Sequence, residues 1–303
     1  MNTNNIRYNE TLTEELDLAI VERSVTGFMA DNTLKGKFVG TKTVMFPEMD
    51  LQGLGDYDRD TGFVRGAVTV SARPFTLQMD RGRYFLIDRE DADESGIPDL
   101  AGKITGEFVR RHVIPEVDAY VMSKLAGVAN LANQAVTGDP ATEAYKMLTE
   151  AIRKVQEEVG YDEELVAFVD GTFDAALQAT PEINRQLVIN DFKKGGITTK
   201  VKSLNDVAIL PVPSSRMKTA YTFNDGETGG QEGGGFTPTE AAKSIGLLVL
   251  PKKAASLIKK TEEVRVFHPD QNLKADAWKI DYRIYYDLVV KNSYRKSVCA
   301  YTY

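Results

Sequence analysis

The sequence has very few of the residues that build disulfide bonds and metal sites. Cys299 is the only cysteine, and His112 and His268 are the only histidines, among 303 residues. No disulfide can form within the chain, cysteine-based metal sites are excluded, and the composition suits a reducing compartment. Two histidines also fall short of the three or four ligands that a zinc site usually requires.

Long apolar runs and an N-terminal leader are lacking as well. No apolar stretch reaches the length needed to cross a bilayer. The start of the chain, MNTNNIRYNE, does not have the basic-then-apolar order of a secretory signal. We therefore expect a protein without a membrane partner, located in the cytoplasm or in a particle assembled there.

No motif of catalysis or cofactor binding stands out. There is no Gly-x-Ser-x-Gly elbow, and the glycine-rich patch 225–235 (DGETGGQEGGG) lacks the Gly-Lys-Ser/Thr ending of a phosphate loop. Its acids Glu227 and Glu232 would repel phosphate, so we interpret it as a flexible loop. The acidic run 88–94 lacks EF-hand spacing and is interpreted as a solvated turn before a helix. We predict no catalytic, cofactor-binding or metal-binding residues, and a protein that is not an enzyme.

The charge balance excludes one further class of protein. The chain carries 44 acidic against 37 basic residues, a formal net charge of −7. This argues against a dedicated nucleic-acid binder that works through a basic field. Hydrophobic content of 42% and charged content of 27% are ordinary for a globular protein with a sizeable core.

The longest helical pattern runs over residues 99–134. Its apolar residues recur at steps of three and four: Ile104, Phe108, Ile114, Val117, Val121, Leu125, Val128 and Leu131. A helix of this length would be roughly 50 Å long. Pro115 disturbs a helix interior by about 3 kcal/mol, and so we expect a kinked helix. The alternative is two helices that meet at Ile114.

Residues 36–88 show strand patterns instead. Apolar residues occupy even-numbered positions at first, with Val68, Val70 and Ala72 alternating with polar residues. After Pro74 they occupy odd-numbered positions, with Phe75, Leu77 and Met79. Such a slip at Pro74 predicts a bulge, a twist or an edge position. With residues 41–49 as the partner strand and 53–62 as the turn, the segment predicts a long two-stranded finger. An isolated hairpin is marginal in water, so we expect its supporting surface to belong to a second copy.

The remaining segments indicate an α/β unit flanked by further elements. We expect residues 11–21 to form a short amphipathic helix in an N-terminal arm. Asp139 and Pro140 begin another helix, which continues to Val159. We expect short helices at 171–179 and 181–190, and a lysine-rich helix from Pro251 that carries Lys252, Lys253, Lys259 and Lys260. Strands are expected at 164–169, 207–212, 244–250, 278–290 and 297–301.

The order of these segments resembles the major capsid protein of tailed bacteriophages, the Hong Kong 97-type coat protein family. The resemblance is carried by FLIDREDADESG (85–96), EFVRRHVIPEVDAYVMSKLA (107–126), SIGLLVLPKKAA (244–255) and ADAWKIDYRIYYDLVV (275–290). It implies an α+β fold with an N-terminal arm (1–35), an extended E-loop (36–81) and a P-domain (82–135) that holds the spine helix 99–134. An α/β A-domain (136–250) and a C-terminal return with closing P-domain strands (251–303) complete it.

The resemblance also implies a function. Such proteins assemble into an icosahedral shell of hexamers and pentamers that encloses double-stranded DNA through non-specific contacts, in the cytoplasm of a bacterial host. The alternative is an encapsulin-like compartment that encloses cargo enzymes. The candidates for contacts between subunits are Leu51, Leu54, Tyr57, Arg59, Arg110, Arg111 and Glu116.

Two departures from the family pattern shape further expectations. Some members lock the shell with a lysine–asparagine bond from the E-loop, whereas residues 53–62 contain no lysine. Some members carry a long N-terminal scaffolding segment, whereas the stretch before the finger is short. We therefore expect no covalent lock of that type, and a separate scaffolding protein or none. The resemblance also implies separate scaffolding and portal proteins as partners.

Overall fold

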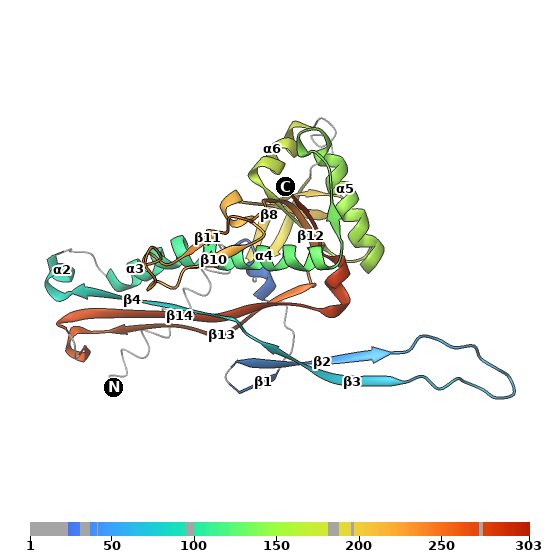
Figure 1. The fold of residues 1–303 in the computed structure, drawn as a ribbon, viewed down its shortest axis with the longest axis horizontal. Coiled ribbons are helices and arrows are strands. Elements are labelled where there is room, and N and C mark those ends of the chain that lie inside the picture. Colours follow the sequence, from blue (N-terminus) through green and yellow to red (C-terminus); the bar gives the residue numbers. More distant parts are fainter. Residues whose placement is uncertain are drawn as a thin grey trace.

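The chain forms an elongated platform, an α/β unit above it and a finger that projects to one side (Figure 1). The computed structural model describes residues 24–30, 37–40, 42–94, 100–180, 188–194, 197–272 and 275–303. The arm helix expected at 11–21 lies outside these residues. None of the described helices combines the length and the apolar character that a membrane crossing requires.

The long helix predicted from the sequence is present. It consists of α3 (Leu100–Phe108), a π-helical turn (Val109–Val113) and α4 (Ile114–Leu131). Val113 and Ile114 keep helical backbone angles, so the chain is one continuous helix rather than two helices meeting at Ile114. The π-helical turn contains Arg111, whose carbonyl the ring of Pro115 would crowd in a regular α-helix. The wider turn therefore accommodates the proline without breaking the helix.

The platform is a three-stranded sheet in the order β13-β14-β4. Its strands are β4 (Met79–Asp88), β13 (Ala255–Phe267) and β14 (Ala277–Val290). The strand predicted at 278–290 is confirmed as β14, and its alternate residues Ile280, Tyr282, Ile284 and Tyr286 are buried in the core that includes α4. The short helix α2 (Arg89–Glu94) follows β4 and covers most of the acidic run.

The lysine-rich helix predicted from Pro251 is wrong. Lys259 and Lys260 lie in β13, whose residues pair with β14 over its whole length. In the second half of β13, buried Val264 and Val266 alternate with exposed Glu263 and Arg265. The spacing of the lysines resembles that of an exposed helix face, but pairing with a long neighbouring strand determines the conformation.

The α/β unit contains a seven-stranded sheet in the order β5-β15-β12-β6-β9-β8-β7. Helix α4 and the platform cover one face of this sheet, and α5 (Pro140–Val159) and α6 (Gly171–Ala179) cover the other. The strands are β5 (Ala135–Val136), β6 (Leu165–Asp170), β7 (Val188–Lys194), β8 (Ile197–Leu204), β9 (Val207–Val212), β12 (Ile245–Pro251) and β15 (Cys299–Thr302). As predicted, the side chain of Asp139 caps α5 by accepting a hydrogen bond from the backbone of Ala141.

The helix predicted at residues 181–190 is wrong over its last three residues, which belong to a strand. Of residues 181–190, the structure describes only the last three, and these begin β7. Strand β7 pairs with β8 through a continuous antiparallel register. Pairing with this neighbour, which the local sequence pattern does not encode, determines the conformation.

The glycine-rich patch is the tip of a hairpin formed by β10 (Tyr221–Phe223) and β11 (Phe236–Pro238). Two arginines of β4 attach this tip to the platform. Arg83 donates to the carbonyls of Glu232 and Gly233 at 3.0 and 2.9 Å, and Arg81 donates to that of Gly235 at 3.2 Å. The loop predicted from composition therefore has defined anchor points.

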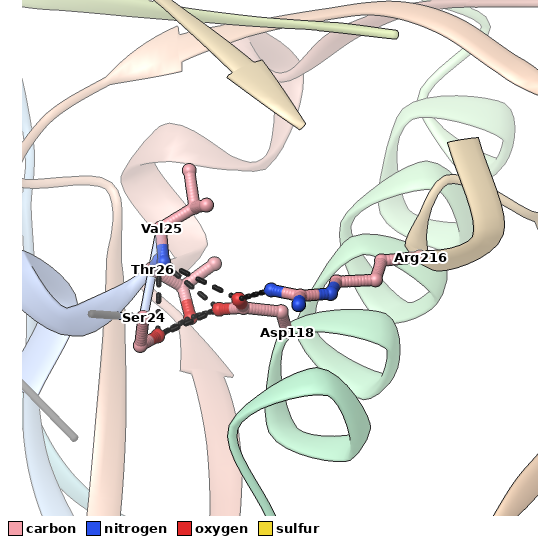
Figure 2. A network of polar contacts seen from close by, with 5 residues as sticks. All are labelled: Ser24, Val25, Thr26, Asp118 and Arg216. Carbon is pink, nitrogen blue, oxygen red and sulfur yellow. Dashed lines mark hydrogen bonds and ion pairs between the residues drawn. The ribbon is translucent and has the colours of Figure 1, made fainter. Parts of the chain in front are cut away.

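A buried carboxylate joins three parts of the body (Figure 2). Asp118 of α4 is fully buried and accepts hydrogen bonds from the hydroxyls of Ser24 and Thr26 at 2.6 and 2.7 Å. It also accepts from the backbone of Val25 and Thr26, and from Arg216 at 3.0 Å. Asp118 thereby holds residues 24–30, the long helix and the 3₁₀ turn Ser214–Arg216 together.

Candidate subunit interface

The finger is a separate antiparallel sheet that extends away from the body (Figure 1). It consists of β1 (Lys37–Val39), β2 (Thr43–Leu51) and β3 (Val68–Thr76) in the order β1-β2-β3. The predicted pair of strands is therefore extended by a third, short strand, which the local pattern did not reveal because it pairs with only three residues of β2. Strands β2 and β3 pair over their full length without a register shift. The shaft of the finger therefore presents two regular faces.

One face of the shaft is apolar. Residues that stand opposite each other in an antiparallel pair share a face, and the pairs on this side are Leu51 with Val68, Met49 with Val70, Pro47 with Ala72, and Met45 with Pro74. We call these eight residues the finger face. Leu51, Val68, Met49 and Val70 are 61, 62, 63 and 65% exposed. A run of exposed apolar side chains of this kind marks an interaction surface.

The opposite face of the shaft is different in character. Ser71 and Arg73 of β3 lie there, and both are exposed. Only near the body does this second face become apolar and buried, where Val44 and Phe75 pair and pack beside Leu77 and Tyr285. The apolar side of the finger thus changes from one face at the shaft to the other at the root.

This change explains the slip in the sequence pattern at Pro74. Of the alternatives predicted there, the edge position is confirmed, since β3 is an edge strand of its sheet. The bulge is wrong, since Pro74 pairs with Met45 in regular register. The even-numbered residues 68–74 lie on the finger face, whereas Phe75 lies on the face that packs against its own molecule at the root. The change at Pro74 therefore separates the exposed residues 68–74 from Phe75, which packs against its own molecule.

The tip of the finger has local structure of its own. Asp58 and Gly62 form an isolated β-bridge, and Asp58 accepts hydrogen bonds from the backbone of Asp60 and Thr61 at 2.7 and 3.1 Å. These backbone donors lower the pKa of Asp58. The rings of Tyr57 and Phe63 pack 4.9 Å apart between centroids. The tip is therefore a preformed knob with exposed aromatic side chains.

The structure divides the predicted contact residues into two groups. Leu51, Leu54, Tyr57 and Arg59 all lie exposed on the finger. Three others lie on the long helix, away from the finger (Figure 1): Arg110, Arg111 and Glu116. Both arginines pair with Glu107 of the same helix, and Glu116 pairs with Arg81 at 2.7 Å. A single subunit does not bring the two groups together.

The partner strand predicted at residues 41–49 is confirmed as β2, but the apolar alternation of that strand was not part of the prediction. Met45, Pro47, Met49 and Leu51 alternate in the sequence, and this signal matches that of Val68, Val70 and Ala72. The sequence does not specify the register between β2 and β3. In the structure this register places the apolar residues of both strands on the same side.

The residues with catalytic potential are scattered. His112 stacks on Phe108 in the π-helical turn, and His268 lies beside Trp278 at the end of the platform. Cys299 is buried, and burial raises the pKa of its thiol to about 11, so the reactive thiolate is disfavoured. Among the described residues there is no group of three or more side chains that could hold a metal ion.

Comparison with known proteins identifies the fold. No family model and no curated protein matches the sequence. Among solved structures, the capsid of cyanophage P-SCSP1u is similar with a TM-score of 0.57 and 14% identity, over 88% of this chain and 84% of that one. The mature capsid of bacteriophage PhiM1 gives a TM-score of 0.55 and 12% identity, over 86% of this chain and 82% of that one.

A third similar structure is a virus-like particle from Pyrococcus furiosus. Its TM-score is 0.50 with 7% identity, over 96% of this chain and 98% of that one. The chain has the Hong Kong 97-type fold of the major capsid proteins of tailed phages.

Proposed function

We propose that this protein is a structural shell subunit, the major capsid protein of a tailed phage. The observation that carries the proposal is the finger face, an exposed ladder of apolar cross-strand pairs on a strand pair that projects from the body. Burying one such side chain contributes about 1.5–3 kcal/mol. A finger of this kind stabilises its own fold little, and gains this energy only against another copy.

Many modest contacts suffice for a closed shell. Each subunit holds several neighbours at once, so the second and later contacts form at high effective concentration. In the proposed shell the subunits form hexamers and pentamers, and separate scaffolding and portal proteins take part in assembly in the bacterial cytoplasm. The role is structural, and no catalytic step is part of it.

Electron microscopy of the purified protein tests this proposal. We expect closed, hollow particles of uniform diameter in negative stain. The proposal would be contradicted by a protein that remains monomeric at high concentration, even when its scaffolding and portal proteins are co-expressed with it.

The content of the shell distinguishes two candidate functions. We propose that the shell encloses double-stranded DNA, which it touches without sequence specificity. The fold shared with the Pyrococcus particle favours, as the alternative, an encapsulin-like compartment that encloses cargo enzymes. Purified particles from the native source should contain nuclease-protected DNA, whereas a stoichiometric enzyme inside DNA-free particles would support the alternative.

We predict that the shell has no covalent lock of the lysine–asparagine type from the finger tip. Residues 53–62 carry no lysine, so the tip lacks the amine that such a bond requires. Denatured particles should give a single band at the 33.5 kDa mass of the chain. A ladder of covalent oligomers in mass spectrometry would contradict this prediction.

A further inference from the structure

The finger and the platform are joined by a very short connection. Strand β3 ends at Thr76 and β4 begins at Met79, yet the two strands belong to different sheets. Only Leu77 and Gln78 lie between them. Whatever holds these two residues determines the direction in which the finger leaves the body.

Two side chains of β14 hold the backbone of this connection. The carboxylate of Asp287 accepts a hydrogen bond from the backbone of Gln78 at 3.0 Å. The hydroxyl of Tyr285 donates to the carbonyl of Leu77 at 3.1 Å. Both ends of the Leu77–Gln78 peptide unit are therefore fixed to the same strand of the platform.

Asp287 is itself held by the long helix. The carboxylate is fully buried and accepts from the hydroxyl of Tyr120 at 2.8 Å and from the ammonium of Lys124 at 2.6 Å. The ammonium of Lys124 also lies 5.7 Å from the ring centroid of Phe75, the last aromatic residue of β3. One buried carboxylate thus links the finger root, the platform and the helix.

Stability alone does not account for such a cluster. A buried ion pair is often no more stabilising than apolar residues of the same volume, because desolvation offsets the attraction. What its hydrogen bonds supply is a defined geometry. Outside the cluster, the finger root is braced by surface contacts of Arg73 with Asn292 and of Lys260 with the carbonyl of Gly40.

The length of the finger makes this geometry consequential. Nine residues of strand span about 30 Å, so a tilt of about 10° at the root displaces the far end by about 5 Å, roughly one inter-strand spacing. A displacement of that size would move the finger face out of register with a neighbouring subunit.

We propose that Asp287 is a positioning residue that sets the direction of the finger, acting through Lys124, Tyr120 and the backbone of Gln78. The inference rests on the proposed function in one respect, that the finger must meet a second copy at a fixed angle for a shell to close.

The test compares two isosteric substitutions. Asp287→Asn replaces one carboxylate oxygen with an amide that donates, so a donor among Gln78, Lys124 and Tyr120 then faces another donor. Asp118→Asn is the matched control. Asp118 lies on α4, is an equally buried carboxylate and is also paired with a cation, and the hydrogen bonds in Figure 2 do not involve the finger.

Finger direction is read from the distance between two spin labels, at Ser71→Cys on the finger and Ala175→Cys on α6. Both positions are exposed, and the single native cysteine is buried, so it does not compete for the label. A small labelled fraction is diluted into unlabelled subunits of the same variant, and electron microscopy gives the yield and diameter of particles.

We expect the unsubstituted protein and Asp118→Asn to share one narrow distance distribution. Asp287→Asn should broaden or shift it by about 3 Å, because Ser71 lies about 17 Å along the strand from the root and a tilt of about 10° moves it by that amount. The yield of closed particles should fall about tenfold or more, because every contact in the shell repeats the error.

If Asp287→Asn keeps both the distance and the particle diameter of the unsubstituted protein, the inference is wrong. If the unsubstituted protein forms no particles, the proposed function fails, while the distances still decide the role of Asp287. Should Asp287→Asn not fold, Lys124→Met removes the cation and keeps an apolar stem, and an unchanged distance there would equally overturn the inference.

Discussion

Replacement of Val70 by aspartate is expected to abolish particle assembly and to leave the subunit folded. Val70 lies on the finger face, 65% exposed, opposite Met49. In a shell this position loses the burial of valine, about 1.5–3 kcal/mol, and gains an unpaired charge against an apolar surface, which costs several kcal/mol more. Size-exclusion chromatography should show the particle peak replaced by free subunits, with an unchanged circular dichroism spectrum.

The adjacent residue provides the control. Ser71→Asp adds the same charge at the next position of the same strand, on the opposite and polar face of the shaft. We expect Ser71→Asp to assemble with a yield close to that of the unsubstituted protein. Assembly by Val70→Asp, or equal failure of both variants, would show that the finger face is not the contact surface.

Replacement of Asp118 by alanine is expected to give the largest loss of stability in the body. The substitution leaves Arg216 without its partner and removes the acceptor of four hydrogen bonds from residues 24–26. Breaking a buried ion pair in this way costs about 3–5 kcal/mol. For a chain of this size that corresponds to a fall in Tm of roughly 6–10 °C.

The measurement requires subunits that do not assemble, because contacts within a shell would add to the apparent stability. Thermal unfolding of Asp118→Ala is therefore compared with its parent in the Val70→Asp background. Glu157→Ala serves as the control, since its pair with Arg153 is exposed on α5 and contributes at most about 0.5 kcal/mol. A fall in Tm no larger than that of Glu157→Ala would mean that Asp118 does not hold the body together.

Local patterns in the sequence correctly predicted the elements whose defining signals lie within one short segment of the chain. The apolar period of residues 104–128 matches the buried and half-buried side of the long helix, whereas Leu131 at its end is 87% exposed. Pro115 disturbs the helix only into a π-helical turn. Asp139 before Pro140 marked the start of α5 correctly. Both signals act over a few residues, and so a single sequence contains them completely.

The predictions that failed depended on neighbours distant in the chain. Lys259 and Lys260 have a spacing compatible with a helix, but they lie in β13, whose partner strand β14 begins only at Ala277. Residues 188–190 became a strand through β8 for the same reason. Strand propensity expresses packing against neighbouring strands more than a preference of the backbone, and the local sequence does not contain those neighbours.

The sequence by itself determined that the finger is a strand pair with an apolar side and no evident cover, because alternation along a strand fixes which side chains share a face. Only the tertiary structure decided the meaning of the slip at Pro74 and the existence of the cluster around Asp287. The residues that meet there, Gln78, Tyr120 and Lys124, are separated from Asp287 by 209, 167 and 163 positions. Contacts at such separations arise from the packing of the helix on the platform, and no local period records them.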